Sequence, residues 1–563
     1  MKDREKQKNM VDVTVVLSPG GEEVRTQVEK GTSLEALARR FNEALPFWVL
    51  AARLDNRLRE MDHPIEESCR VVFLDMRDPS ANMIYQNSLS FIYLKAVQDV
   101  LGEVSVDIEN SLNGGLFTEI RGPAPVTAED IKAVERRMRE LVEADLPFVR
   151  GSMSREEAVK KLSRGNHEEK LAMLQFSQVE KVPIYSLDGV PNFFYGIMVP
   201  STGYIRHFEL RKYRNGVLLR FPNQKKPNEI PPYRDDVKLY RAFGEAKRWG
   251  DLMGISYVAE LNKVVADGRY KQVIQISEAL HEKKIAQIAD VIGKRGARLV
   301  LIAGPSSSGK TTFARRLCIQ LRVLGIESLY MSTDDYFVER SQTPLDENGE
   351  PNFEDIDALD LKLFNNNMND LLAGREVDLP TFDFLEGKKL FGRRISRLEK
   401  GQTIVMEGIH GLNRQLTSHI EDKEKFKIYI SPFTQLSIDN HNRIPTTDAR
   451  MLRRIVRDHQ FRGYSAQRTI GQWPKVRAGE DKNIFPYNGE ADMLFNSVHI
   501  YELAVLKKYA EPLLAAIGPE QTEYGEAVRM LKFLRFFQTI EDDSIIVNNS
   551  IIREFIGGSI FVD

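Results

Sequence analysis

The sequence predicts an α/β protein of several domains, the largest of which is a three-layer domain built on a parallel sheet. Three consecutive features near the middle of the chain support this prediction. The apolar run 299–303 has the length of a buried strand, the loop after it reads GPSSSGKT, and a helix with an apolar face follows. Strand, loop and helix in this order match the P-loop pattern, so this domain is expected to bind a nucleotide.

Length and composition narrow the class of protein. A chain of 563 residues is too long for one hydrophobic core and predicts three or four units. Lys and Arg total 79 against 81 for Asp and Glu, a formal net charge of −2, which gives no overall signature of nucleic-acid binding. The two cysteines, Cys69 and Cys318, argue against a disulfide framework and fit a reducing cytoplasm. Apolar runs fall short of the ~18 residues that span a membrane, so no membrane partner is expected.

The first 222 residues are expected to form two small domains. Residues 1–9 are charged and are expected to form a disordered, solvated tail. Strand-like runs and a helix beginning after Thr32 and Ser33 predict a ββαβ unit over 10–76. This order resembles a TGS domain, the ubiquitin-like module at the N-terminus of threonyl-tRNA synthetases. Residues 77–222 resemble the α+β second, editing-type domain of the same synthetases, on VTAEDIKAVERRMRELVEADLPFVRGSMSREEAVKKL (126–162) and VPSTGYIRHFELRKYRNGVLLRF (199–221).

The synthetase resemblance also implies what this half lacks. The His-x-x-x-His pair of the editing domain falls on Asn87 and Phe91, and its Cys-x-x-x-His pair falls just before Val199, where neither residue type stands. A phenyl ring cannot ligate a cation, so no editing hydrolase is expected, and the lone His207 is expected to be structural. This half could still bind RNA, a small ligand or the other half of the chain, and a spacer role is the alternative.

Residues 223–296 are expected to link the two halves. Four prolines and no periodicity mark a linker, after which apolar spacing predicts one connector helix over 252–265 and another over 280–292. Their basic residues are expected to be solvated faces rather than an RNA site.

Residues 297–563 are expected to form the P-loop domain. Its glycines permit backbone conformations in which successive N–H groups turn toward phosphate oxygens at a helix N-terminus. The lysine adds a charge near the β- and γ-phosphates, and the hydroxyl after it is placed to ligate Mg²⁺. The predicted ATP-binding residues are Gly304, Pro305, Ser306, Ser307, Ser308, Gly309, Lys310, Thr311 and Thr312.

A second strand, 328–332, ends at TDDYF. An acidic residue at the carboxyl end of a strand beside a P-loop lies where a doubly wound sheet binds its ligands. Asp334 is therefore a candidate catalytic base, and a surface acidic turn is the alternative.

This segment resembles uridine–cytidine kinase, within the phosphoribulokinase/uridine kinase group of P-loop NTPase-fold kinases. The resemblance implies that Asp334 is the base and lies near Mg²⁺, and that Asp357, in DIDALD, holds the acceptor sugar.

Two further motifs carry the resemblance. FDFLEG corresponds to the nucleobase motif, which implies that Phe382 and Phe384 contact the base, although Gly387 replaces the family's base-reading His and both rings could be core residues. TIVMEG resembles the family's Phe-Glu-Gly and assigns Glu407 to the Mg²⁺ environment. The implied metal ligands are therefore Thr311, Asp334 and Glu407.

ARMLRRIVRDHQFRG matches the family's arginine-rich lid motif. The resemblance implies that Arg453 and Arg462 bind ATP, that Arg454 contacts the ATP phosphates and the substrate, and that Arg454 and Arg457 stabilise the migrating phosphoryl together with Lys310. A solvated helix face is the alternative. Outside the aligned motifs, Arg443 and Arg553 are candidate extra phosphate contacts or packing residues.

The motifs predict ATP- and Mg²⁺-dependent phosphorylation of a nucleoside, first of all uridine or cytidine at the 5′-hydroxyl. Two alternatives stay open: a kinase for another small alcohol of the same group, because the base-reading His is absent, and an ATP-dependent RNA-binding regulator. The family resemblance further implies a homo-oligomer.

Overall fold

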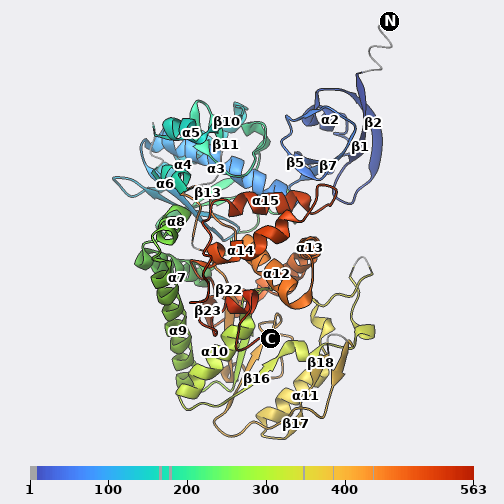
Figure 1. The fold of residues 1–563 in the computed structure, drawn as a ribbon, viewed down its shortest axis with the longest axis vertical. Coiled ribbons are helices and arrows are strands. Elements are labelled where there is room, and N and C mark those ends of the chain that lie inside the picture. Colours follow the sequence, from blue (N-terminus) through green and yellow to red (C-terminus); the bar gives the residue numbers. More distant parts are fainter. Residues whose placement is uncertain are drawn as a thin grey trace.

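The computed structural model describes residues 9–163, 168–176, 181–346, 349–383, 386–434 and 436–562. The predicted tail lies outside this description apart from Asn9. A small N-terminal sheet, a second α+β region and a C-terminal half around a parallel sheet follow one another along the chain (Figure 1). In the part of the chain so described, no helix is both long and apolar enough to cross a bilayer.

The N-terminal region is a mixed sheet with one short helix packed on it. The strand order is β2-β1-β7-β4-β5, with β1 antiparallel to β2 and parallel to β7. Ser33 caps helix α2 by accepting a hydrogen bond from the Ala36 amide, and Leu34 and Leu37 are buried. This confirms the predicted ββαβ order. The elements are β1 (Met10–Val16), β2 (Glu23–Glu29), β3 (Thr32–Ser33), α2 (Leu34–Arg39), β4 (Val49–Leu54), β5 (Arg57–Arg59), β6 (Pro64–Ile65) and β7 (Cys69–Asp75).

The second region packs the long helix α3 against an antiparallel sheet of order β13-β14-β9-β8. A smaller sheet of order β10-β11-β12 lies beside it with two short helices. The predicted closing strands are present as β13 and β14. The elements are α3 (Pro79–Leu101), β8 (Ser105–Leu112), β9 (Gly115–Arg121), α4 (Ala128–Glu143), β10 (Val149–Ser154), α5 (Arg155–Leu162), α6 (Glu168–Phe176), β11 (Lys181–Leu187), β12 (Val190–Phe193), β13 (Glu209–Tyr213) and β14 (Gly216–Arg220).

Three helices connect this region to the parallel sheet: α7 (Val237–Met253), α8 (Val258–Ala266) and α9 (Tyr270–Arg295). The prediction of one helix over 252–265 is wrong, because α7 ends at Gly254, which has a left-handed φ of +65°. Glycine adopts that conformation without a steric penalty and so ends helices.

The C-terminal half is organised on a five-stranded sheet of order β16-β21-β15-β22-β23 in which every neighbouring pair is parallel. All carboxyl ends therefore lie at one edge. The strands are β15 (Leu299–Ala303), β16 (Ser328–Ser332), β21 (Thr403–Glu407), β22 (Lys425–Ser431) and β23 (Met493–Asn496). Two small ribbons, β17 (Val377–Asp378) with β20 (Ile395–Ser396) and β18 (Thr381–Asp383) with β19 (Lys388–Leu390), extend from it.

Helices cover both faces of this sheet, which confirms the predicted three layers. On β15, Leu299 and Leu301 share a buried cluster with α11 (Leu361–Leu372), whereas Val300 and Ile302 pack with α9 and α10 (Lys310–Val323). Successive side chains of a strand point to opposite faces, so a continuous apolar run is what a doubly covered strand requires.

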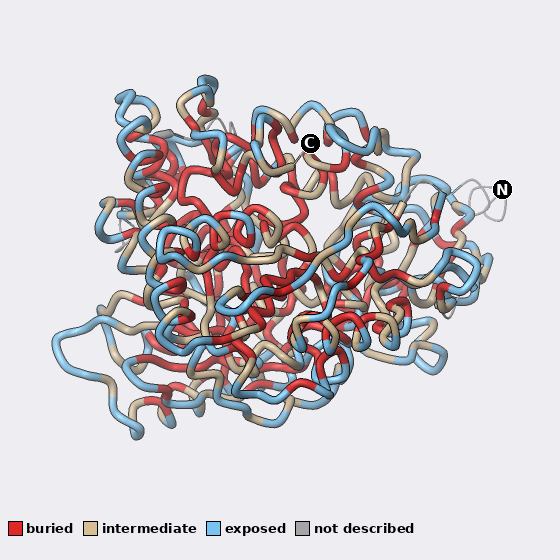
Figure 2. The backbone as a smooth tube through the Cα atoms, turned by 90° about the horizontal axis from the view of Figure 1, so that it is seen from below, coloured by how far each residue is buried: buried red, intermediate tan, exposed pale blue. Residues whose placement is uncertain are grey.

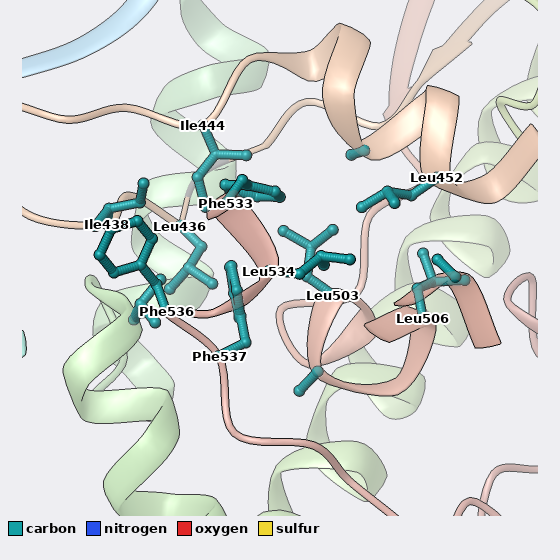
Figure 3. Close-up of a cluster of buried hydrophobic side chains, with 14 of the residues drawn as sticks. Leu436, Ile438, Ile444, Leu452, Leu503, Leu506, Phe533, Leu534, Phe536 and Phe537 are labelled. Carbon is teal, nitrogen blue, oxygen red and sulfur yellow. The ribbon is translucent and has the colours of Figure 1, made fainter. Parts of the chain in front are cut away.

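The remaining helices lie between the sheet and the N-terminal regions (Figure 1). They are α12 (Thr446–Arg462), α13 (Ala466–Asn483), α14 (Glu502–Ala515), α15 (Tyr524–Leu534) and the short α16 (Arg553–Ile556). Figure 3 shows Leu452, Leu503 and Phe533 of these helices converging with Ile438 and Ile444 of the loop before α12.

This cluster also contains side chains of the second region and of the connector helices, including Leu162, Phe193 and Val258. Figure 2 accordingly shows buried backbone through the middle of the molecule and exposed segments at its outer loops. The two halves thus share a hydrophobic core rather than being joined by the linker alone.

Candidate active site

The P-loop joins β15 to α10 at the carboxyl edge of the sheet. A side chain at Gly304 would collide with the Ile430 carbonyl, and Gly309, with φ of +84°, begins the helix in a left-handed conformation. Lys310 Nζ donates to the Pro305 carbonyl at 3.3 Å, so the ammonium group lies over the loop. Helix N-terminal amides beside a cation are the chemistry that binds phosphate.

Two carboxylates from distant segments bind amides of this loop. The Ser306 amide donates to Glu480 Oε1 of α13 at 3.1 Å. The Thr312 amide and hydroxyl both donate to Glu554 Oε2 of α16, at 3.1 and 2.8 Å. Neither glutamate belongs to a motif, so neither could be predicted from the sequence.

Asp334 and Glu407, the acidic pair, lie beside the loop. Thr311 Oγ1 donates to Glu407 Oε1 at 3.3 Å, and the Ser332 and Tyr330 hydroxyls donate to the same oxygen at 3.3 and 3.2 Å. Burial, and next the charge of Asp334, raises the pKa of Glu407 from its usual 4.5 to about 7. Burial also raises the pKa of Asp334, while Lys310 opposes that shift. The structure thus brings together Lys310, Thr311, Asp334 and Glu407.

Three of the four predicted lid arginines converge on one buried carboxylate of α12. Arg454, Arg457 and Arg462 lie 3.3, 2.9 and 3.3 Å from Asp458 oxygens. Arg454 also donates to Ser306 Oγ at 2.7 Å, and Arg462 is close enough to oppose the raised pKa of Asp334. Arg454 thus contacts the P-loop, and Arg462 lies near Asp334 of the acidic pair.

Arg453 differs from the other three. Its side chain is 0% exposed and bonds both oxygens of Glu502, from Nε at 3.0 Å and from Nη2 at 2.6 Å. Nη1 donates to the Ser307 carbonyl at 3.3 Å, and Nη2 to the Ser497 carbonyl at 2.8 Å. Its guanidinium thus braces the back of the P-loop. Arg450, which lies outside the predicted set of arginines, also braces the loop: it bonds Glu480 and donates to the Ser306 carbonyl.

Residues 299–504 match the family model of the phosphoribulokinase/uridine kinase family. This segment is a kinase domain of that family, and it contains the P-loop, the acidic pair and α12. Enzymes of this class are phosphotransferases with an alcohol group as acceptor.

The N-terminal region matches threonine–tRNA ligases. The ligase of Anoxybacillus flavithermus is 28% identical over 202 residues, which cover 36% of this chain and 31% of the ligase. The chain thus spans about a third of the length of these curated relatives.

Solved structures that resemble the chain include a possible uridine kinase from Bacillus stearothermophilus, at 19% identity and a TM-score of 0.24 over 37% of this chain and 96% of that one. Another is a D-glycerate 3-kinase from Cryptococcus neoformans, at 13% identity and a TM-score of 0.29 over 36% and 89%.

Within the kinase domain, Glu354 lies close enough to Lys310 and Asp334 to feel their charges, whereas Asp357 is exposed. Burial, and next the charge of Glu480, raises the pKa of Glu354 from 4.5 to about 7, and Arg454, Lys310 and Asp334 all lie close enough to affect it. Asp357 is exposed, and its backbone amide donates to Asp355 Oδ1 at 3.1 Å. The segment NFEDIDALD holds four acidic residues within seven positions, so spacing alone could not select Glu354.

Of the two predicted base-contacting aromatics, Phe382 belongs to the described residues and is not displayed on an open surface. Phe382 is buried and packs edge-on against Phe337 with ring centroids 5.7 Å apart. Phe384 lies outside the described residues. Gly387, where the family has its base-reading His, has φ of +68°, and a Cβ there would lie 2.8 Å from Arg340 Cβ.

The donor set at the acidic pair suits Mg²⁺. Glu407, Asp334 and the Thr311 hydroxyl supply hard oxygen ligands, and a cation would relieve the repulsion that raises the pKa of Glu407. Among the described residues no group of three or more His, Cys, Asp or Glu side chains forms a metal cage. Mg²⁺ is usually held by one or two carboxylates plus substrate phosphates and waters, so the arrangement fits.

Phe91, at a position where the synthetase resemblance implies a metal ligand, packs against other aromatic rings. Its ring centroid lies 5.9 Å from that of Phe148 and 5.5 Å from that of Phe194. The backbone amide and carbonyl of His207 bond the Tyr85 hydroxyl at 3.0 and 2.8 Å.

Arg443 and Arg553 make packing contacts. Arg443 Nη2 donates to Gln86 Oε1 at 3.2 Å, and Arg553 Nη2 donates to the Asp543 carbonyl at 2.7 Å. Neither contact lies on the P-loop.

Proposed function

We propose that the protein transfers a phosphoryl group from ATP·Mg²⁺ to a primary hydroxyl of a small polyhydroxy acceptor, in the first place the 5′-hydroxyl of uridine or cytidine. The observation that carries this proposal is the acidic pair beside Lys310 and Thr311. A nucleotide switch needs no carboxylate placed to take the proton of an acceptor hydroxyl, whereas hydroxyl activation does.

The residues divide the work as follows. Lys310 attracts the β- and γ-phosphate oxygens, and Glu407 with Thr311 holds Mg²⁺, which would neutralise phosphate charge when bound. The oxygen of the acceptor hydroxyl bonds to the γ-phosphorus while Asp334 takes the proton of that hydroxyl. The bond between the γ-phosphorus and the bridging oxygen of the β-phosphate breaks, and ADP leaves.

Two further groups serve the acceptor and the transferred phosphoryl. Glu354 accepts hydrogen bonds from acceptor hydroxyls, because a carboxylate can accept from two vicinal hydroxyls at once. Arg454, Arg457 and Arg462 face charge that develops on the migrating phosphoryl.

A small alcohol without a base is the second candidate acceptor. It is favoured by the burial of Phe382 and by the proximity of Arg340 to Gly387, which together leave less room for a stacked base than the sequence motif suggests. RNA binding by the N-terminal half, proposed from its match to threonine–tRNA ligases, is compatible with either acceptor.

The test is ADP release from ATP·Mg²⁺ against a panel of nucleosides, pentose phosphates and other small alcohols, with and without tRNA. Saturable turnover with uridine or cytidine supports the nucleoside proposal, and turnover with another acceptor supports the second candidate. ATP hydrolysis stimulated by tRNA, with no transfer to any small acceptor, would contradict both and favour an RNA-binding regulator.

A further inference from the structure

The C-terminal segment, residues 548–562, reaches back to the P-loop from the far end of the chain. It ends between α12 and the parallel sheet (Figure 1). Within it, Glu554 of α16 accepts both hydrogen bonds that Thr312 can donate from its amide and its hydroxyl. Thr312 is 0% exposed and Glu554 only 7%.

The Thr312 amide is one of the phosphate-binding donors of the motif. It belongs to the first turn of α10, where the backbone N–H groups have no partner within the helix. In a P-loop these N–H groups cradle the α- and β-phosphates. A carboxylate oxygen placed on them makes the hydrogen bonds that a phosphate oxygen would make, so Glu554 and a nucleotide cannot both use Thr312.

The contact of Glu554 differs from that of the other carboxylate at the loop. Glu480 is paired with Arg450 and Arg477, so its charge is compensated inside the protein. In the described part of the chain no cation pairs with Glu554, and Thr312 is its one hydrogen-bond partner. Its charge is instead close enough to raise the pKa of Glu407. Glu554 thus has the environment of an anion held by a helix N-terminus.

Apolar residues hold the segment in this position. Ile551 and Phe555 are 0% exposed, and Ile551 lies so close to Gly309 that a Cβ there would be 2.5 Å from its Cγ2. Phe555 lies beneath the Arg453 guanidinium at 4.9 Å from its ring centroid. Lys310 and Thr311 are only half-buried, so the contact covers the inner end of the loop and leaves the end at Lys310 accessible.

We propose that the C-terminal segment is an autoinhibitory element, in which the Glu554 carboxylate competes with the α- and β-phosphates of the nucleotide for the N-terminus of α10. This inference rests on the proposed nucleotide site of the kinase domain. Nucleotide binding requires Glu554 to leave Thr312. Breaking that contact costs free energy, so ATP binds more weakly than it would without the contact.

The experiment is calorimetric titration of the full-length protein with ATP·Mg²⁺. Glu554→Ala removes the competing carboxylate and is expected to bind ATP about tenfold more tightly than the wild type, as for loss of one charge-assisted contact. Glu554→Gln keeps the shape without the charge, should give a smaller gain, and serves if the alanine variant does not fold. Glu541→Ala, at an exposed glutamate that precedes this segment, should bind like the wild type.

The outcomes separate this inference from the proposed function. Equal or weaker ATP binding by both Glu554 variants overturns the autoinhibition, even if the kinase turns over. A gain in affinity without turnover on any acceptor supports the autoinhibition and counts against the kinase proposal alone. Absence of ATP binding in every variant overturns both, because competition requires a nucleotide.

Discussion

Arg453 distinguishes a residue that supports the P-loop from one that binds the nucleotide. The family motif implies a phosphate contact, but the structure buries the guanidinium completely and pairs it with both oxygens of Glu502. Arg453→Met removes the cation and leaves a buried carboxylate whose remaining described partner is the His499 amide, at 2.9 Å. Breaking a buried pair by removing one partner costs about 3–5 kcal/mol. The kinase domain should lose that much stability.

The assay is hydrogen exchange of β15 and α10, together with thermal unfolding, because a chain with several regions has no single unfolding free energy. Arg457→Met is the matched control. Its partner Asp458 keeps Arg454 and Arg462, so stability should change by less than ~1 kcal/mol while turnover falls.

A double variant, Arg453→Met with Glu502→Leu, removes both charges. Because apolar replacement of a buried pair is often neutral, it should recover most of the lost stability. The reasoning is refuted if Arg453→Met unfolds and exchanges like the wild type yet binds ATP poorly, since the guanidinium would then act on the nucleotide.

Three further predictions follow from the site and from the contact between the two halves. Asp334→Asn should lower turnover by about 10²–10⁴-fold with ATP affinity kept, measured by ADP release and calorimetry; unchanged turnover would exclude it as the base. Between pH ~4.5 and 7 Glu354 and Glu407 bind more protons in the folded protein without nucleotide than in the unfolded chain, because their pKa values are raised to about 7. The contribution of Glu407 to thermal stability should therefore fall as pH rises through this range and level off above it, and the difference in thermal stability between the wild type and Glu407→Gln, followed against pH, measures it. Lys170→Met should destabilise the contact of α6 with the loop before α12 by about 3–5 kcal/mol, because it leaves the fully buried Asp439, 3.1 Å from the Lys170 ammonium, without its cation. Exchange in that loop should report this loss, and an exposed lysine variant, Lys160→Met, should show none.

The sequence was sufficient for features whose causes are local. The strand at 299–303, the glycines of the P-loop and the helix after it follow from apolar spacing and from the positive φ that glycine permits, both of which act within a few residues. Asp334 and Glu407 could be predicted as neighbours for a related reason. Both end parallel strands, and the carboxyl ends of such strands meet at one edge.

Tertiary structure alone decided the features that depend on packing between distant segments. The segment NFEDIDALD offers four acidic residues to the acidic pair. The packing of that turn against α13 selects one of them, and the motif does not predict which. Arg453 and Arg457 are four positions apart on one helix, yet a carboxylate from α14 buries the first while the second stays partly exposed. Glu554 meets Thr312 across 242 positions. No periodicity or spacing encodes such a contact, because it arises only when the whole hydrophobic core has closed around it.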